Sequence, residues 1–240
     1  MLEFRSDNEA TRNHWVRAQL ASLPSGARLL DAGAGMQPYR DDCAHLDYVT
    51  QDFAQYDGQG DGRGGQVKGW SNRGIDWACD ITALPTEDAS FDAVLCTEVL
   101  EHVPDPVAAI RELCRVLKPS GVLLITAPFV SNTHFSPYHF CTGFNRSFYE
   151  THLQQAGLEI ERLEANGGFF DLVSQEVSRT GQMAKRYTGK GPGWLTNAAL
   201  AFAAARLRKL SKRDQGSSEY LAFGLHVKAV KCASTALRAA

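Results

Sequence analysis

The sequence lacks an excess of charge of either sign: 25 Lys and Arg side chains stand against 27 Asp and Glu, a formal net charge of -2. Binding along a nucleic-acid backbone depends on a strongly basic surface, so we expect no nucleic-acid partner. No window reaches the roughly 18–20 consecutive apolar residues of a transmembrane helix. The first fifteen residues carry charges throughout and lack the apolar core of a secretory signal. These absences predict a cytoplasmic protein without a transmembrane segment.

The sequence also lacks paired cysteines. Its six cysteines contain no C-x-x-C motif, and several lie inside apolar runs, where a thiol behaves as a small hydrophobic group. This usage is typical of a reducing compartment and indicates neither a zinc site nor a disulfide framework. We therefore predict no metal site. The cysteines are Cys43, Cys79, Cys96, Cys114, Cys141 and Cys232.

What is present is enough apolar sequence for one substantial core: 44% of 240 residues, which favours a single domain over 1–240. Short apolar runs typical of buried strands alternate with segments of helical periodicity. This order predicts right-handed βαβ units and an α/β fold, with a mostly parallel sheet and helices on both faces. The expected strands are 27–33, 46–53, 75–81, 90–96 and 122–129, and the expected helices 7–23, 106–117 and 147–156.

Two late segments, 158–165 and 220–231, alternate with period two and could pair as an antiparallel edge. Between them, residues 168–217 form an insertion too long for a structureless loop, with helical patterns at 170–186 and 193–210. The second helix ends in basic side chains, which its dipole favours, and a packing helix is the simplest interpretation. A lid, a homodimer face and a peripheral membrane contact are the alternatives.

The segment LDAGAG at 30–35 ends an apolar run in a glycine-rich turn, which lets a backbone approach a ligand. Such turns serve several nucleotides, and a simple tight turn is the alternative. The third glycine of a dinucleotide motif is replaced by Pro38, and Asp31 would repel a pyrophosphate but suit an ammonium or sulfonium group. Because no Tyr-x-x-x-Lys pair is present either, an NAD(P)-dependent oxidoreductase is disfavoured.

Two further acids follow strand ends. Asp52 can accept both ribose hydroxyls of an adenosine, and Asp80 can accept from an adenine amino group while Ile81 packs on the ring. An ordinary exposed carboxylate is the alternative for Asp52. The glycine-rich stretch 57–74 that follows it has the turn chemistry of a flexible surface loop.

Taken in order, LDAGAG, Asp52, CDITALP, FDAVLCTEVLEHVPDP and IRELCRVLKPSGVLLITAP resemble the class I S-adenosylmethionine-dependent methyltransferases, in the methyltransferase type 11 branch. The resemblance spans residues 25–165. It implies a Rossmann-like, doubly wound, seven-stranded sheet with one antiparallel strand, and S-adenosyl-L-methionine as cofactor. The long loop after Asp52 departs from the family pattern. The cofactor-binding residues it implies are Asp31, Ala32, Gly33, Gly35, Asp52, Phe53, Asp80, Ile81, Thr97, Glu98 and His102.

The segment after the fifth strand, APFVSNTHFSPYHFCTGFNRSFYETHL, is similar to the H-x-x-P-Y-(D/H)-F…R pattern of methyltransferases that accompany polysaccharide or glycolipid assembly. Its polar and aromatic side chains predict a small-molecule pocket, although core aromatics and structural histidines are the alternative. His134 is our candidate general base, His139 is the second, and His102 more simply orders its loop. The expected substrate-binding residues are Tyr138, Asn145, Arg146 and Tyr149.

The leading hypothesis is O-methylation of a sugar or other small metabolite. N-methylation of a small amine, which needs less help from a base and could rely on Glu98, is the first alternative. A non-catalytic protein that binds S-adenosylmethionine is the second.

Overall fold

The computed structural model describes residues 7–233, so residues 1–6 of the charged N-terminal stretch lie outside the described part. The described chain divides into two compact units. We call residues 12–164 with 224–233 the sheet unit, and residues 7–11 with 165–223 the helical unit. Among the helices of the described residues, none combines the length and the apolar content needed to cross a membrane.

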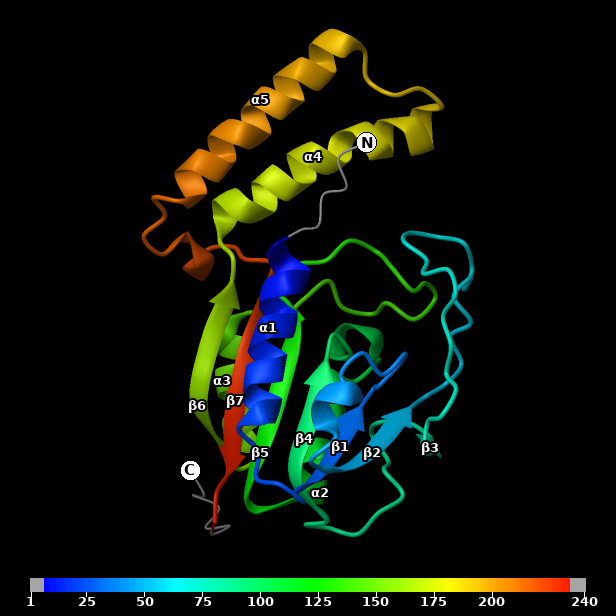
Figure 1. The fold of residues 1–240 in the computed structure, drawn as a ribbon, viewed down its shortest axis with the longest axis vertical. Helices are drawn as coiled ribbons and strands as arrows, with labels where there is room; N and C mark the ends of the chain where they lie inside the picture. Colours follow the sequence, from blue (N-terminus) through cyan, green and yellow to red (C-terminus); the bar gives the residue numbers. More distant parts are fainter. Residues whose placement is uncertain (1–6, 234–240) are drawn as a thin grey trace. The chain divides into compact units, whose positions relative to one another are not determined.

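A seven-stranded sheet forms the centre of the sheet unit, in the order β3-β2-β1-β4-β5-β7-β6 (Figure 1). The strands from β3 to β5 pair in parallel, and β7 runs antiparallel to β5, so the expected fold class is confirmed. The strands are β1 Arg28–Ala32, β2 Asp47–Asp52, β3 Trp77–Ala78, β4 Phe91–Thr97, β5 Leu117–Pro128, β6 Leu158–Asn166 and β7 Gly224–Lys231.

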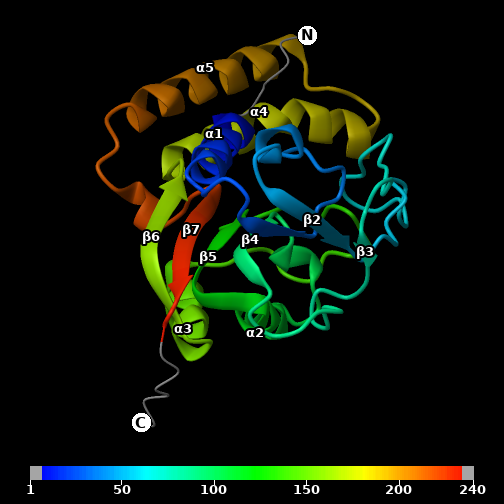
Figure 2. The same ribbon diagram turned by 60° about the horizontal axis from the view of Figure 1, so that its bottom comes forward.

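Helices cover both faces of the sheet because its central strands are apolar on both sides (Figure 2). Trp15, Val16 and Leu20 of α1 pack on one face, and Ile110 and Leu113 of α2 are buried against the other. The helices are α1 Asp7–Ala21, α2 Pro106–Val116, α3 Arg146–Gln155, α4 Phe169–Thr188 and α5 Trp194–Ser211, with short 3-10 helices η1 Asp41–Cys43, η2 Leu100–His102 and η3 Ser217–Glu219.

Two strands differ from expectation. β3 has only two residues, because the Asp76 carboxylate accepts from the Thr50 N–H (2.9 Å) in the place where a backbone ladder would continue. β5 begins at Leu117, directly after α2, although the sequence Lys-Pro-Ser-Gly predicts a break there. Ser120 takes a left-handed conformation (φ 64°), and the pairing with β4 shifts register at this point, which absorbs the turn residues into the strand.

The helical unit contains α4 and α5, within a few residues of the predicted helices. They pack on one another, and the buried Ser174 hydroxyl donates to the carbonyl of Ala204 (3.2 Å). α5 also exposes Trp194 and Phe202, which are 78% and 68% accessible, so packing on α4 accounts for only part of its apolar surface. The roles of this insertion as a lid, a dimer face or a membrane contact stay predictions.

The C-terminus of α2 is closed by a side chain from β7. α2 passes into β5 without a glycine cap, and its last carbonyl groups have no partner within the helix. The half-buried ammonium of Lys231 donates to the carbonyls of Cys114 and Leu117, each at 2.7 Å. A positive charge at this end also complements the helix dipole.

We expect Lys231→Met to lower the free energy of unfolding by about 2 kcal/mol, because two partly buried carbonyls lose a charged donor. Lys228→Met is the matched control on the same strand, since Lys228 pairs with the half-exposed Glu161 (2.8 Å). A pair of this kind contributes under about 1 kcal/mol. Urea denaturation of the two variants measures the difference, and equal losses would contradict the capping role.

Candidate functional site

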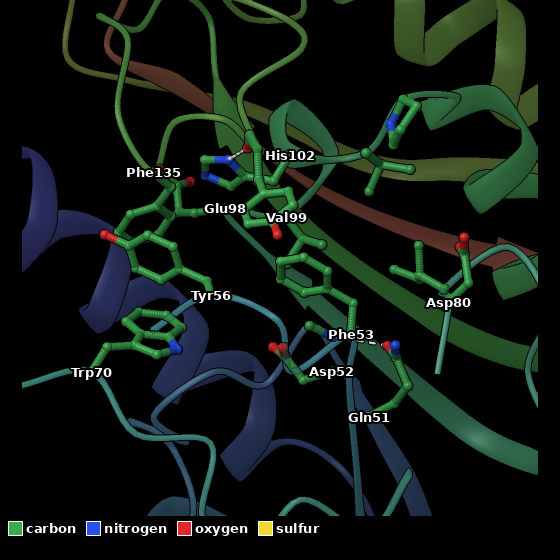
Figure 3. Close-up of a pocket in the computed structure, with 15 residues that line it drawn as sticks. Gln51, Asp52, Phe53, Tyr56, Trp70, Asp80, Glu98, Val99, His102 and Phe135 are labelled. Atoms are coloured by element: carbon green, nitrogen blue, oxygen red, sulfur yellow. Dashed lines mark hydrogen bonds between the residues drawn. The ribbon is translucent and has the colours of Figure 1, made fainter. Parts of the chain in front are cut away.

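The carboxyl ends of β1, β2 and β4 border a cavity of about 710 Å³, part of which is open to solvent (Figure 3). Strand order reverses between β1 and β4, and ligands of open α/β sheets bind at such a point. The lining residues are Gly33, Gln51, Asp52, Phe53, Tyr56, Trp70, Asp80, Ile81, Glu98, Val99, His102, Val103, Pro104, Phe135 and Tyr138.

The turn after β1 is held by the end of β2. The N–H groups of Gly33 and Ala34 both donate to the carbonyl of Gln51, at 2.8 and 2.9 Å, and the Gly35 N–H donates to the Asp52 carboxylate at 2.9 Å. Gly33 has φ 76°, and a Cβ there would lie 2.4 Å from a methyl of Val99. These N–H groups are already bonded, so the turn offers no cradle for a pyrophosphate.

Three carboxylates lie along the cavity. Asp52 is buried and also accepts from the Ala54 N–H (2.8 Å); burial raises its pKa, and the two N–H donors oppose that rise. Asp80 is oriented by the N–H and hydroxyl of Thr82, each at 2.8 Å. In Figure 3, Asp80 lies at the end of the cavity away from Tyr56 and Trp70, with Asp52 between them.

The third carboxylate, Glu98, follows β4 in a left-handed conformation (φ 54°). Such a conformation costs a non-glycine residue of order 1 kcal/mol and persists where the surroundings hold it. Here the Thr126 hydroxyl donates to one carboxylate oxygen (3.0 Å) and Arg12 of α1 pairs with the other (3.1 Å). The strained backbone thus keeps an acid at the cavity wall.

An aromatic wall closes the other end. The rings of Tyr56, Trp70 and Phe135 lie 4.5–5.4 Å apart between centroids, and Phe53 meets Tyr138 at 4.8 Å. Phe53 and Tyr138 are among the site residues expected from the sequence, whereas the cluster of Tyr56, Trp70 and Phe135 is not. Two of its rings, Tyr56 and Trp70, adjoin or lie in the glycine-rich stretch and were the available signal.

The glycine-rich stretch 57–74 is not a free surface loop, and that interpretation is wrong where it meets the segment after β5. Gly65 donates to the carbonyl of Thr133 and accepts from Phe135, both at 2.9 Å. The Asp61 N–H donates to the carbonyl of Ser136 (3.0 Å). Several of its glycines have positive φ, and a Cβ on Gly64 would lie 2.2 Å from the Thr133 carbonyl oxygen. Glycine is needed here for close approach of two backbones.

Three histidines gather beside the aromatic wall. The His102 ring lies 4.6 Å from that of His134 and 5.9 Å from that of His139. Only His102 borders the cavity itself. Burial and the neighbouring His134 lower the pKa of His102 to about 3, so its ring is neutral at physiological pH.

Comparison with known proteins agrees with this geometry. Residues 30–125 match a family described as a methyltransferase domain. The chain is 38% identical over 138 residues to a demethylmenaquinone methyltransferase of Renibacterium salmoninarum, covering 55% of this chain and 50% of that one. Over 47 residues it is 58% identical to a ubiquinone biosynthesis O-methyltransferase of Xanthomonas oryzae pv. oryzae, covering 20% and 19%. Among solved structures, the [4+2]-cyclase SpnF is similar, with 25% identity, a TM-score of 0.52 and coverage of 94% and 82%.

Residues 30–125 form a class I S-adenosylmethionine-dependent methyltransferase domain of the type 11 branch. The chain spans half the length of the first curated relative and 19% of the second.

The methyltransferase domain brings seven of the eleven expected cofactor residues to the cavity: Gly33, Asp52, Phe53, Asp80, Ile81, Glu98 and His102. Ala32, Gly35 and Thr97 do not border it, although Gly35 supports Asp52 from behind.

Three expected substrate residues also lie elsewhere. Asn145 caps α3 by accepting from the Phe148 N–H (3.0 Å), and Arg146 pairs with Glu150 (3.5 Å) on the exposed surface. Tyr149 is fully buried in the core. Of the four, only Tyr138 borders the cavity.

Asp31 is turned away from the cavity by the alternation of β1. Leu30 and Ala32 face one core cluster, so Asp31 faces the other, where the Tyr48 hydroxyl donates to its carboxylate (2.5 Å). Burial raises the pKa of Asp31 to about 6, and the hydrogen bond from Tyr48 opposes the rise.

A raised carboxyl pKa means that the fold favours the protonated form, so wild-type stability falls as pH rises from about 4 to about 6. Asp31→Asn cannot titrate. We expect its stability relative to wild type to improve by up to about 3 kcal/mol between pH 4 and pH 7.5, measured by urea denaturation without ligand. Asp47→Asn, at the exposed start of β2, is the control. A pH-independent difference for Asp31→Asn would contradict the titration.

Proposed function

We propose that the protein transfers a methyl group from S-adenosylmethionine to a hydroxyl of a small acceptor. The observation that carries this proposal is a cavity bordered by three carboxylates, beside a turn whose N–H groups are already bonded. Such a surface disfavours phosphates and favours a positively charged ligand rich in hydrogen-bond donors. Hydroxyls, an amino group and a sulfonium have this character together in the adenosyl cofactor.

The residues present fit this cofactor. Asp52 would accept from the ribose hydroxyls, and Asp80 from the adenine amino group, with Ile81 against the ring. A Cβ at Gly33 would lie 2.4 Å from a methyl of Val99, so a side chain there would displace Val99 or the turn, both of which border the cavity. Glu98 would face the sulfonium end.

The acceptor would occupy the aromatic end. When bound, the cofactor supplies the methyl group, which passes to the acceptor oxygen while the carbon–sulfur electron pair stays on sulfur. Phe53, Tyr56, Trp70, Phe135 and Tyr138 would stack on a flat acceptor, orient it and exclude water. Stacking favours a flat ring over a sugar. The names of the two relatives contain menaquinone and ubiquinone, so we propose a quinone-like ring as the first acceptor class.

Removal of the proton from the acceptor hydroxyl would fall to the three neighbouring histidines. His102 is too weak a base at a pKa of about 3, so the proton would be handled by His134 or His139, which adjoin it. An amine acceptor would need less of this help, so N-methylation is the second candidate.

The fold alone does not decide the reaction, since SpnF is described as a cyclase. Direct measurement of cofactor binding separates the alternatives.

We expect Asp52→Asn to raise the Kd for S-adenosylmethionine at least about tenfold, because hydrogen bonds to a charged acceptor contribute about 1.5–3 kcal/mol. Asp47→Asn, at the opposite end of β2, should leave the Kd unchanged. Calorimetric titration measures both. Binding of NADH but not S-adenosylmethionine by the wild-type protein would refute the proposal.

We expect His134→Ala to lose about 100-fold or more in turnover while keeping cofactor affinity within twofold, since proton handling contributes that much. Release of S-adenosylhomocysteine is followed with small phenols, catechols, sugars and amines. His14→Ala, on the exposed side of α1, is the control. Unchanged turnover would remove His134 from the reaction.

A further inference from the structure

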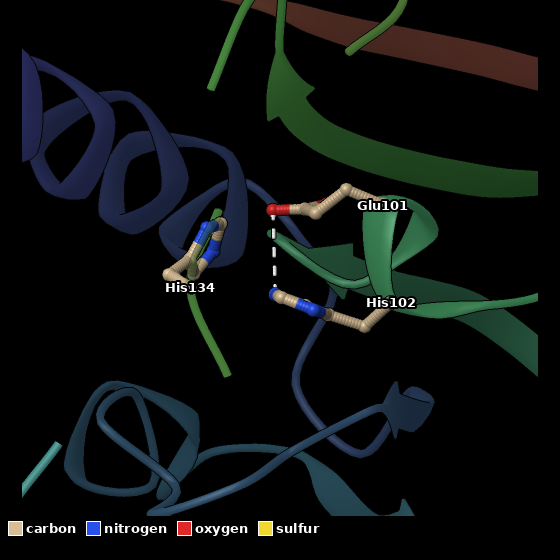
Figure 4. A group of neighbouring side chains, drawn as sticks. All are labelled: Glu101, His102 and His134. Atoms are coloured by element: carbon tan, nitrogen blue, oxygen red, sulfur yellow. Dashed lines mark ion pairs between the residues drawn. The ribbon is translucent and has the colours of Figure 1, made fainter. Parts of the chain in front are cut away.

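Beside the cavity, three side chains point toward one another: Glu101 and His102 from η2, and His134 from the segment after β5 (Figure 4). One ligand atom from each lies within 4.8 Å of the others. The Glu101 carboxylate and the Nε2 of His102 are 3.7 Å apart, which is too long for a hydrogen bond.

A backbone carbonyl fixes which ring nitrogen of His102 and of His134 carries the proton. The Nδ1 of His102 lies 2.5 Å from the carbonyl oxygen of Tyr138, and the Nδ1 of His134 lies 2.8 Å from that of Asn132. A carbonyl can only accept, so each Nδ1 carries the proton and each Nε2 presents a lone pair. A backbone carbonyl behind the second ring nitrogen is the usual support of a metal-ligating histidine.

The carboxylate of Glu101 is in a costly position. Glu101 is 1% exposed, and among the described residues neither its Oε2 nor the Nε2 of His102 has a hydrogen-bond partner. Burial and the charge of Glu98 raise the pKa of Glu101, and the charge of Arg12 opposes that rise. Buried polar atoms without partners cost free energy, and a cation at this point would satisfy them together.

We propose that Glu101, His102 and His134 bind a divalent first-row transition-metal ion, such as Zn²⁺, Mn²⁺ or Fe²⁺. Bonds of about 2.1 Å place tetrahedral ligands about 3.4 Å apart, so the 3.7 Å pair already fits. The ligand atom of the half-buried His134 lies within 4.8 Å of the other two, and a shift of its segment would bring it to bonding distance. Two imidazoles with one carboxylate favour these ions over Mg²⁺ or Ca²⁺.

Three protein ligands leave a coordination position open, as in catalytic zinc sites. Because His102 borders the cavity, that position faces the acceptor end. This role rests on the proposed methyl transfer: the ion would bind the acceptor hydroxyl and lower its pKa, so that its proton leaves to solvent. His134 then acts as a ligand and not as a base.

The test uses the full chain, stripped with a chelator and then titrated with Co²⁺ and Zn²⁺. We expect one ion per chain by mass spectrometric metal analysis and visible absorption bands from bound Co²⁺. His134→Ala should weaken Co²⁺ binding at least about tenfold. His14→Ala should bind as wild type does. Because Glu101 is buried, Glu101→Gln is used only after circular dichroism shows that it folds, and it should weaken binding as well.

Absence of stoichiometric Co²⁺ or Zn²⁺ in the wild type, or equal binding by His134→Ala, overturns the metal site. Turnover that survives the chelator while His134→Ala is inactive also overturns it and restores the base. Metal binding without S-adenosylmethionine binding in calorimetry would instead sink the methyltransferase proposal and leave the ion site standing. Turnover lost with the chelator and restored by Zn²⁺ or Mn²⁺, but not Mg²⁺, supports both.

Discussion

The hydrogen bonds between the turn after β1 and the end of β2 determine what this cavity can hold. Gln51 and Asp52 accept the N–H groups of Gly33, Ala34 and Gly35, which in a dinucleotide-binding fold would be left for phosphate. Gly33 has a positive φ and a Cβ there would lie 2.4 Å from a methyl of Val99, so this turn requires glycine. Because these N–H donors are already bonded, the polar groups left to bind a ligand at the cavity are mainly carboxylates. Carboxylates favour cations and hydroxyl groups.

The acceptor end depends on a second junction, between the glycine-rich stretch and the segment after β5. Backbone bonds from Gly65 and Asp61 fix residues 133–136, and the same segment carries Phe135 into the aromatic wall and His134 toward Glu101. Glycines permit the close approach of the two backbones, and the rings of Tyr56 and Trp70 pack against that of Phe135. This junction therefore positions both the aromatic wall and His134. Substitutions in the glycine-rich stretch should consequently affect the reaction that depends on His134.

Periodicity and strand-end chemistry predicted the mostly parallel sheet and the acids Asp52 and Asp80, because these features depend on local sequence. The family resemblance implied the seven strands, the antiparallel strand and Glu98. The alternation of β1 already implied that Asp31 faces away from Ala32, yet the motif alone placed it at the ligand. The expected substrate residues Asn145, Arg146 and Tyr149 belong to the start of α3. Asn145 caps this helix, Arg146 forms a surface ion pair, and Tyr149 packs in the core. Trp70 and Phe135 meet only through the non-local junction, which no sequence window contains.

The prediction of no metal site rested on cysteine spacing and did not weigh Glu101, His102 and His134 together. Glu101 and His102 are adjacent in the chain and His134 lies far from them, so no motif joins them; the fold does. Glu98 and Glu101 both follow β4, and of the two only Glu98 borders the cavity. The sulfonium and the metal ion would each bring positive charge to this end, where Arg12 pairs with Glu98 (3.1 Å). The charge of Glu98 raises the pKa of Glu101, and bound cationic groups would offset this repulsion between the two acids.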